Sequence, residues 1–209
     1  MNSIARWSAA GVAVVVGALI VLMATAPDNP NEETVSPLVG RTAPAIVSVD
    51  TEGQEFRLDD YEGSWVLLNF FATWCVPCVR EHPELVAFSE RHAAIGDAAV
   101  VSVAFDDSPE SIAEFFDDNG GDWQVVADDR VDPAVEAAGG TDLHGGVAPK
   151  ISLDYGVVKL PESYLISPEG VVVHKFVGGI RAAEVEAEIA RASGVGGGAS
   201  GGAAGEDGS

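Results

Sequence analysis

The sequence predicts an α/β fold, formed by a single domain over residues 38–193 of the 209-residue chain. Two apolar runs, Val66–Phe71 and Ala99–Phe105, have the length and composition of buried strands. Each run is followed by a segment with helix-start signals, and strands that alternate with helices form a sheet covered by helices. About 150 residues remain once the two ends of the chain are set aside, which is enough to bury a core.

The domain is expected to begin with a β-hairpin. Ala43–Val49 is largely apolar, and Glu55–Leu58 alternates charged and apolar residues. Between them, Asp50–Gln54 holds residues that are typical of a turn.

Two helices have clear start signals. The first follows Cys75 and runs to about His92. The second has Ser108 as its N-cap and Pro109 at its first position, and it ends near Asn119.

The remaining elements follow in order. Gln124–Ala127 is expected to be a strand, and a short helix that starts at Asp132 is expected to end near Gly139. A glycine-rich loop then runs from Gly139 to about Leu153. The chain is expected to end with an apolar strand after Pro161, a turn, a second strand and a last helix, the latter three at Ser167–Gly170, Val171–Val177 and Ala182–Ala192. The loop either binds a partner or is a tolerated insertion, and its His144 is expected to be solvated.

The N-terminal segment, residues 1–27, is predicted to be a transmembrane anchor. Ala9–Ala26 is an almost wholly apolar run that nearly spans the hydrocarbon core of a bilayer as a helix. Arg6 favours a cytoplasmic N-terminus, which places the domain outside the cytoplasm. A cleaved signal peptide is the alternative, because Ala24–Ala26 has the form of a cleavage site, although Pro27 after it disfavours the cut.

The segments on either side of the domain have the composition of linkers. Residues 28–37 are polar and proline-containing, which indicates a linker off the membrane. Residues 194–209 are mostly glycine, alanine and serine and are expected to be disordered. No cysteine lies near the end of the apolar run, which excludes a lipoprotein anchor.

The chain is strongly acidic, with a formal net charge of −22 and a pI near 4.2. This charge argues against binding to nucleic acid or to an anionic membrane surface. The acidic surface either keeps the protein soluble or steers a basic partner towards it.

The chemistry is expected at Cys75 and Cys78, the only two cysteines of the chain. They lie three residues apart at the predicted helix start, where Pro77 fits because the first turn lacks intrahelical N–H partners. The helix N-terminus should lower the pKa of Cys75, so Cys75 is the expected attacking sulfur and the more shielded Cys78 the resolving one.

Two other uses of the cysteine pair are weaker. Zinc needs about four ligands, and the chain has no second cysteine pair and no closely spaced histidine pair. A structural disulfide seldom closes so short a loop at the junction between a strand and a helix. A lone redox pair without other cysteines suits an oxidising compartment.

The motif and its flanks resemble a known group of proteins. Trp74–Cys78 resembles the active site of thioredoxin-like proteins, and Leu68–Trp74 and Arg80–Pro83 resemble the flanks found in membrane-anchored extracytoplasmic thioredoxins of the ResA, TlpA and CcmG (DsbE) group. The resemblance covers about Gly40 to Ala192. It implies a thioredoxin-like fold, with a central mixed sheet flanked by helices and an N-terminal β-hairpin extension.

By this resemblance, several residues outside the cysteine pair contact the substrate. Pro161 is expected to be a cis proline beside the cysteines, which exposes the preceding backbone for pairing with an incoming peptide. Trp74, with Pro77, is expected to form a wall of the substrate groove rather than part of the core. Lys159 and Leu160 are expected at the facing edge.

Two carboxylates are candidates for proton transfer and for raising the thiol pKa. Glu81 follows Cys78 by three residues on the same helix face, and Glu162 follows the expected cis proline. The alternative for Glu81 is a solvated residue paired with Arg80 or Arg91, and the alternative for Glu162 is an ordinary surface position.

The resemblance implies a thiol-disulfide oxidoreductase that needs no bound cofactor. Its expected substrate is a disulfide in an exported protein, with apocytochrome c before haem attachment as the best candidate. Its expected electron donor is a membrane dithiol protein of the DsbD/CcdA type.

Three rival functions require other features. A thiol peroxidase would need proline at Leu68 and threonine at Ala72, and both are absent. A disulfide-forming oxidase differs in its redox potential. A copper-binding assembly protein would need a histidine, His144 or His174, near the cysteine pair.

Overall fold

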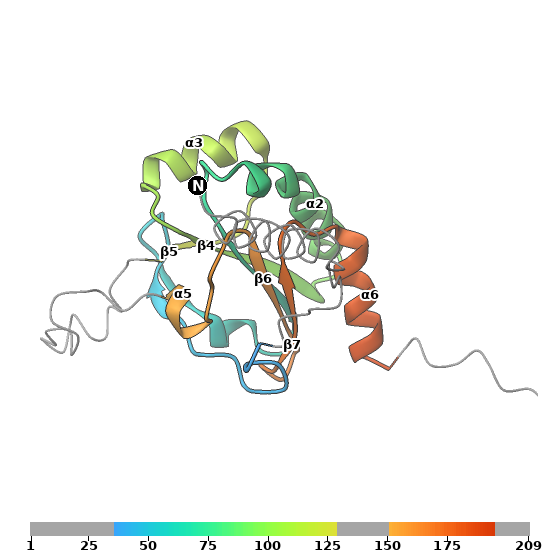
Figure 1. The fold of residues 1–209 in the computed structure, drawn as a ribbon. Helices are drawn as coiled ribbons and strands as arrows, with labels where there is room; N and C mark the ends of the chain where they lie inside the picture. The colour runs from blue at the N-terminus through green and yellow to red at the C-terminus, as the bar shows by residue number, and fades with distance from the viewer. Residues whose placement is uncertain (1–35, 129–150, 195–209) are drawn as a thin grey trace, which may run out of the picture. The chain divides into compact units, whose positions relative to one another are not determined.

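The computed structural model describes residues 36–128 and 151–194 (Figure 1). Its centre is a five-stranded sheet in the order β5-β4-β3-β6-β7. Strand β3 pairs in parallel with β4 and antiparallel with β6, so the sheet is mixed, as predicted. The strands are β3 (Trp65–Phe71), β4 (Ala98–Ala104), β5 (Val125–Ala127), β6 (Glu162–Ile166) and β7 (Val172–Val177).

The predicted N-terminal hairpin is confirmed. Strands β1 (Val47–Val49) and β2 (Glu55–Arg57) pair antiparallel across a turn in which Asp50 Oδ1 accepts hydrogen bonds from the backbone of Glu52 and Gln54. A 3₁₀ helix, η1 (Leu58–Tyr61), follows at once.

The two faces of the sheet are covered by different elements. The helix face, which includes Leu67 and Leu165, packs against α2 (Val76–Ala93), α3 (Pro109–Asn119) and α6 (Ala182–Ala192). The hairpin face packs against β1–β2, η1 and the short helix α5 (Ile151–Asp154). Because successive strand residues point to opposite faces, β3 alternates between these two cores and is buried on both.

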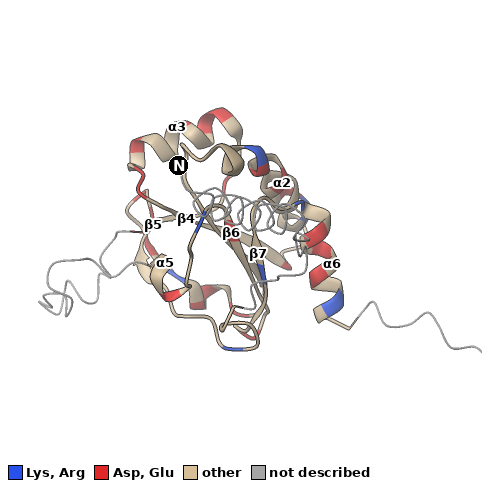
Figure 2. Cartoon of the chain, viewed as in Figure 1, with Lys and Arg blue, Asp and Glu red and all other residues tan. Residues whose placement is uncertain are grey.

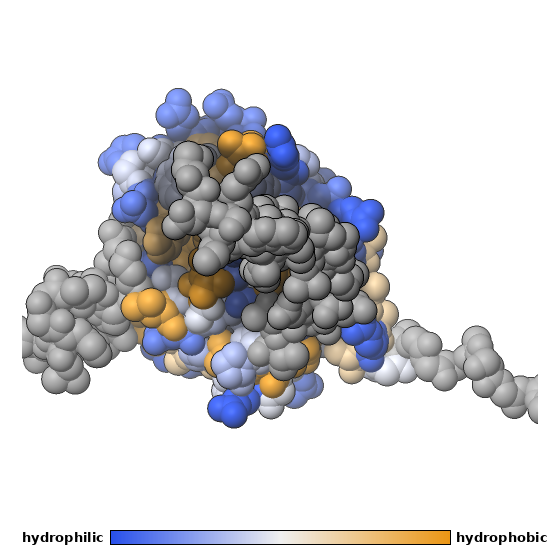
Figure 3. Space-filling model, viewed as in Figure 1, coloured by the Kyte–Doolittle hydropathy of each residue, from blue (hydrophilic) through white to orange (hydrophobic). Residues whose placement is uncertain are grey.

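Three predicted helices, α2, α3 and α6, are confirmed with boundaries within about a residue. Ser108 caps α3 by accepting a hydrogen bond from the Ser111 N–H at 3.1 Å, and Pro109 occupies the first position of the helix. Acidic residues are spread over the outer sides of α3 and α6 (Figure 2). On the face drawn in Figure 3, apolar patches lie among hydrophilic residues.

One predicted boundary is wrong, and several other predictions concern segments outside the described residues. The end of the predicted loop at Gly139–Leu153 is helical, since α5 begins at Ile151. The Ser152 N–H and Oγ–H both donate to the carboxylate of Asp128, the residue after β5, at 2.7 Å and hold α5 in place. The rest of that loop, the helix predicted at Asp132, and the predicted anchor, linker and tail lie outside the described residues.

No helix within residues 36–128 and 151–194 combines the length and the apolar character that crossing a bilayer requires.

Candidate active site

The two cysteines lie where β3 leaves the sheet and α2 begins. Cys75 is the N-cap residue of α2, with an extended backbone, and Cys78 lies in the first turn of the helix. Their sulfurs form a disulfide with the Cα atoms 5.2 Å apart. Cys75 is 7% exposed and Cys78 is 2% exposed, so the sulfur at the helix N-terminus is the more accessible one, as the sequence predicts.

The loop before the cysteines is held by the neighbouring loop after β4. The Thr73 N–H and Oγ–H both donate to the Asp107 carboxylate, each at 2.7 Å. The Trp74 ring projects outward and is 60% exposed, with its Nε1 3.5 Å from the Asp106 carbonyl oxygen. Trp74 is therefore a surface residue beside the disulfide, and the alternative that it belongs to the core is excluded.

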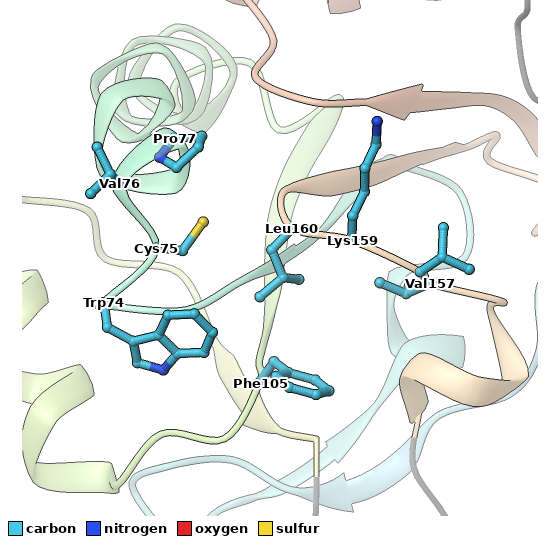
Figure 4. A pocket seen from close by; sticks show the side chains of 9 residues that line it. Trp74, Cys75, Val76, Pro77, Phe105, Val157, Lys159 and Leu160 are labelled. Carbon is cyan, nitrogen blue, oxygen red and sulfur yellow. The ribbon is translucent and has the colours of Figure 1, made fainter. Parts of the chain in front are cut away.

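A cavity of about 540 Å³ opens beside Cys75 (Figure 4). The described residues that line it come from the cysteine loop, the end of β4 and the segment before β6: Trp74, Cys75, Val76, Pro77, Phe105, Val157, Val158, Lys159 and Leu160. The predicted groove residues Trp74, Pro77, Lys159 and Leu160 thus meet around one space.

The segment facing the cysteines contains the predicted cis proline. The Leu160–Pro161 peptide bond is cis, and the Pro161 carbonyl accepts a hydrogen bond from the Gly178 N–H at 2.9 Å. Among the described residues, none bonds to the backbone N–H or C=O of Leu160. Leu160 can therefore pair with an added strand in the cavity.

Glu81 is buried on the helix face and is only 3% exposed. Its Oε1 accepts a hydrogen bond from Asn69 Nδ2 at 2.7 Å, and its Oε2 accepts one from the Ile180 N–H at 3.0 Å. Burial raises the pKa of Glu81 to about 7, although both hydrogen bonds favour the ionised form. The alternative of a solvated Glu81 paired with an arginine is excluded, since Arg91 Nε lies 2.7 Å from Glu186 instead.

Glu162 is also buried, but on the hairpin face. It is the first residue of β6 and shares its face of the strand with Tyr164, while Ser163 between them points to Asn69 on the helix face. Lys175 Nζ lies 2.9 Å from Glu162 Oε2, an ion pair whose approach angle is poor for a hydrogen bond. The alternative of a surface position is excluded, and the proton-transfer role of Glu162 stays a prediction.

Lys175 is a suitable partner for this carboxylate. Burial by itself lowers the pKa of Lys175, but its interactions with the Tyr164 and Glu162 side chains raise that pKa above its ordinary value. The ammonium group also lies 5.2 Å from the centre of the Tyr164 ring. The ion pair therefore holds the start of β6, directly after the cis proline, against β7.

Three polar residues of the site were not singled out from the sequence. Asn69 could have been found, because a polar residue in the middle of a buried strand needs a hydrogen-bond partner. Asp107 and Lys175 carry no such local signal, since strand register and loop packing bring them to their partners. In residues 36–128 and 151–194, no three His, Cys, Asp or Glu side chains gather as a metal site.

The sequence matches known proteins over most of the domain. The profile of the AhpC/TSA family matches residues 39–175. The thiol-disulfide oxidoreductase ResA of Bacillus subtilis is 33% identical over 139 residues, which cover 66% of this chain and 67% of ResA. The ResA protein of Geobacillus kaustophilus is 30% identical over 157 residues, which cover 75% of this chain and 79% of the relative.

Solved structures share the fold. A protein described as the thiol:disulfide interchange protein DsbE of Chlorobium tepidum superposes with a TM-score of 0.54 at 27% identity, covering 72% of this chain and 94% of that one. The thioredoxin domain of a thiol-disulfide oxidoreductase from Bacteroides vulgatus gives a TM-score of 0.56 at 22% identity over 73% of this chain and 96% of the domain. With the Cys75–Cys78 pair in place, the chain belongs to the AhpC/TSA family as a thioredoxin-like thiol-disulfide oxidoreductase of the ResA and CcmG group.

Proposed function

We propose that this oxidoreductase is tethered to the membrane by residues 1–27 and reduces disulfides of exported proteins outside the cytoplasm. In the first step the Cys75 thiolate attacks one sulfur of the substrate disulfide; a mixed disulfide forms, and the other substrate sulfur leaves as a thiolate. In the second step the Cys78 thiolate attacks Cys75 Sγ, the Cys75–Cys78 disulfide forms, and the second substrate sulfur leaves. Two electrons pass from the enzyme dithiol to the substrate.

The observation that carries the reducing direction is the buried Glu81 carboxyl. Cys78 and Glu81 lie three residues apart, one above the other on the same face of α2. An ionised carboxylate in this buried position disfavours a thiolate on the neighbouring cysteine, and a dithiol whose thiolates are disfavoured is a stronger reductant. With a pKa raised to about 7, Glu81 can also accept the Cys78 proton near neutral pH.

The cavity supports binding of an extended segment of substrate. Trp74 and Pro77 form one wall, and Leu160 forms the other, with its backbone available for strand pairing. In this arrangement a substrate sulfur meets Cys75 at the helix N-terminus, where the N–H groups favour the thiolate.

For the substrate we propose apocytochrome c before haem attachment, and for the electron donor a membrane dithiol protein of the DsbD/CcdA type. The support for exported substrates is the similarity to ResA and DsbE proteins. The acidic surface, with a net charge of −22, suits a basic substrate protein at long range.

The test is the reduction potential of the full-length protein in detergent micelles, equilibrated against glutathione and dithiothreitol buffers. A value at or below about −220 mV is expected for a reductant of exported proteins. A value near about −120 mV belongs to a disulfide-forming oxidase and would overturn the proposal.

A pair of variants tests the part played by Glu81. Glu81→Gln removes the buried charge, and the potential is expected to become less negative. Glu90→Gln makes the same charge change on an exposed residue of the same helix and is expected to leave the potential unchanged. Equal shifts in both variants would show that only net charge matters.

A further inference from the structure

The cavity beside Cys75 differs in charge from the rest of the protein. The chain has 33 Asp and Glu residues against 11 Lys and Arg. Yet among the nine described residues that line the cavity, none is acidic, and Lys159 is the one charged residue. A substrate segment that binds in this cavity therefore contacts the positive charge of Lys159, although the protein as a whole is strongly anionic.

No carboxylate among the described residues pairs with the ammonium group of Lys159. Five other cationic side chains there have a carboxylate within 4.0 Å: Arg57, Arg91, Lys175, Arg181 and Arg191. Lys159 forms no such pair with a described residue, and its side chain is exposed. Figure 4 shows this side chain rising between Leu160 and Val157 at the rim of the cavity.

The rest of the rim is apolar and open to solvent. Trp74 is 60% exposed, Val76 is 59% exposed and Val158 is 83% exposed. Large apolar side chains that cluster at this level of exposure mark a contact surface. They also lower the local dielectric around Lys159 once a segment covers them, which strengthens its attraction to a carboxylate.

We propose that the cavity selects disulfides in segments that combine an apolar side chain beside the reactive cysteine with a carboxylate that pairs with Lys159. This inference rests on the proposed function, because it defines the substrate class of the same site. The net charge of −22 attracts basic partners at long range, whereas Lys159 disfavours a basic side chain at the point of contact. The preferred substrate therefore has an acidic side chain next to its disulfide.

The test uses peptides that each contain one intramolecular disulfide. A first series places Glu at each position flanking the cysteines, with Gln and Lys at the same positions as matched peptides. The rate constant for exchange with the full-length protein in detergent is measured by stopped-flow fluorescence. At one flanking position or more, the Glu peptide is expected to react about fivefold faster than its Gln match, and the Lys peptide more slowly still.

Two variants isolate the contribution of Lys159. Lys159→Glu is expected to reverse the order of the Glu and Lys peptides. Arg41→Glu makes the same charge change at an exposed residue outside the cavity lining and is expected to preserve the order. A reversal in both variants, or in neither, would overturn the assignment to Lys159.

The apolar part is tested with peptides that carry Leu or Ser beside the reactive cysteine. The Leu peptide is expected to react faster with the wild-type protein, and Val158→Ser is expected to reduce that preference. Equal rates for Leu and Ser peptides would overturn this part of the inference.

Each series is run in both directions, as dithiol protein with disulfide peptide and as disulfide protein with dithiol peptide. One outcome is that the peptides show the same order of rates in both directions while their oxidation is faster than their reduction. That result would overturn the proposed function as a reductant and leave the inference about Lys159 standing. Equal rates for the Glu, Gln and Lys peptides in both directions would overturn the inference itself.

Discussion

At the scale of single residues, the protonation of Glu81 is coupled to the orientation of the Asn69 side-chain amide. Oε2 of Glu81 faces the Ile180 N–H and Oε1 faces the Asn69 amide nitrogen, so both oxygens already meet donors. The Asn69 Oδ1 atom has no hydrogen-bond partner among the described residues. A proton added to Oε1 therefore requires the Asn69 amide to rotate and present its oxygen to Glu81.

The raised pKa of Glu81 predicts how stability depends on pH. The folded protein keeps this proton up to about pH 7, whereas the unfolded chain loses it near the ordinary value of 4.5. The free energy of unfolding therefore falls as the pH rises from about 4.5 to about 7, by about 3 kcal/mol from this group. Glu81→Gln is expected to remove that part of the pH dependence, as measured by urea unfolding of both proteins. Parallel curves for the two proteins would contradict the assignment.

A second prediction separates Asn69 from its other neighbour, Ser163. The hydrogen bond from Asn69 lowers the pKa of Glu81, so Asn69→Ala is expected to move that pKa above 7, as measured by carbon NMR of the carboxyl group. Ser163→Ala removes only the 3.0 Å contact to Asn69 and is expected to leave the pKa close to its wild-type value. The same change in both variants would mean that packing, rather than the amide donor, sets the pKa.

How far the site could be predicted differs from residue to residue. Cys75 lies at a helix N-terminus, as the local sequence predicts, and the peptide bond before Pro161 is cis, as the resemblance to the family implies. The partners of the two carboxylates were not foreseen, because Asn69 reaches Glu81 through helix packing and Lys175 reaches Glu162 through strand register. Neither relation leaves a pattern in the sequence of one element.

At the scale of elements, α2 is joined to α3 by a buried histidine. His82 lies one turn after Cys78, is 2% exposed, and its Nε2 lies 2.7 Å from the Gly120 carbonyl oxygen at the end of α3. Its ring packs against Phe115, Phe116 and Trp123, with centroid distances of 4.7, 5.2 and 5.3 Å. The active-site helix and α3 are therefore coupled through a neutral imidazole.

This contact predicts a loss of stability in mild acid. Burial lowers the pKa of His82, partly offset by the bond to Gly120, so the unfolded chain binds this proton more readily than the folded protein does. The stability that His82 contributes is present above about pH 6.5 and is lost as the pH falls through the folded pKa. His82→Phe keeps the ring packing but leaves the Gly120 carbonyl unpaired. It is expected to cost about 1 to 3 kcal/mol at pH 7.5 and to flatten the loss below pH 6.5, in urea unfolding. A steeper loss in the variant would contradict this role.

The elements themselves were largely predictable, and the exceptions have physical reasons. The α6 helix, Ala182–Ala192, matches its predicted bounds because its acidic and apolar residues alternate with helical period. Helix α5 was not predicted because it has only four residues, too few to show a period, and is held by Asp128, which lies far from it in the sequence. Short elements thus depend on tertiary contacts that no local pattern reveals.

At the scale of the whole molecule, the excess of acidic residues sets how the protein responds to salt. The Arg91–Glu186 and Arg181–Glu184 ion pairs join side chains that are 40% to 73% exposed, so each contributes little to stability. Against them stands the self-repulsion of a chain with a net charge of −22. Repulsion between many like charges acts over longer distances than a contact pair, so salt screens it more completely.

This balance predicts that salt stabilises the fold. Raising the ionic strength from about 0.01 M to about 0.5 M shortens the screening length several-fold, which weakens the repulsion among the acidic side chains more than it weakens the ion pairs. The urea midpoint of the full-length protein is therefore expected to rise with added sodium chloride, at nearly constant slope of free energy against urea. The control is the same titration at pH 4.5, where many carboxyl groups are neutral and the rise is expected to shrink. A midpoint that falls with salt at pH 7 would show instead that the surface ion pairs outweigh the repulsion. The acidic residues would then not destabilise the folded state.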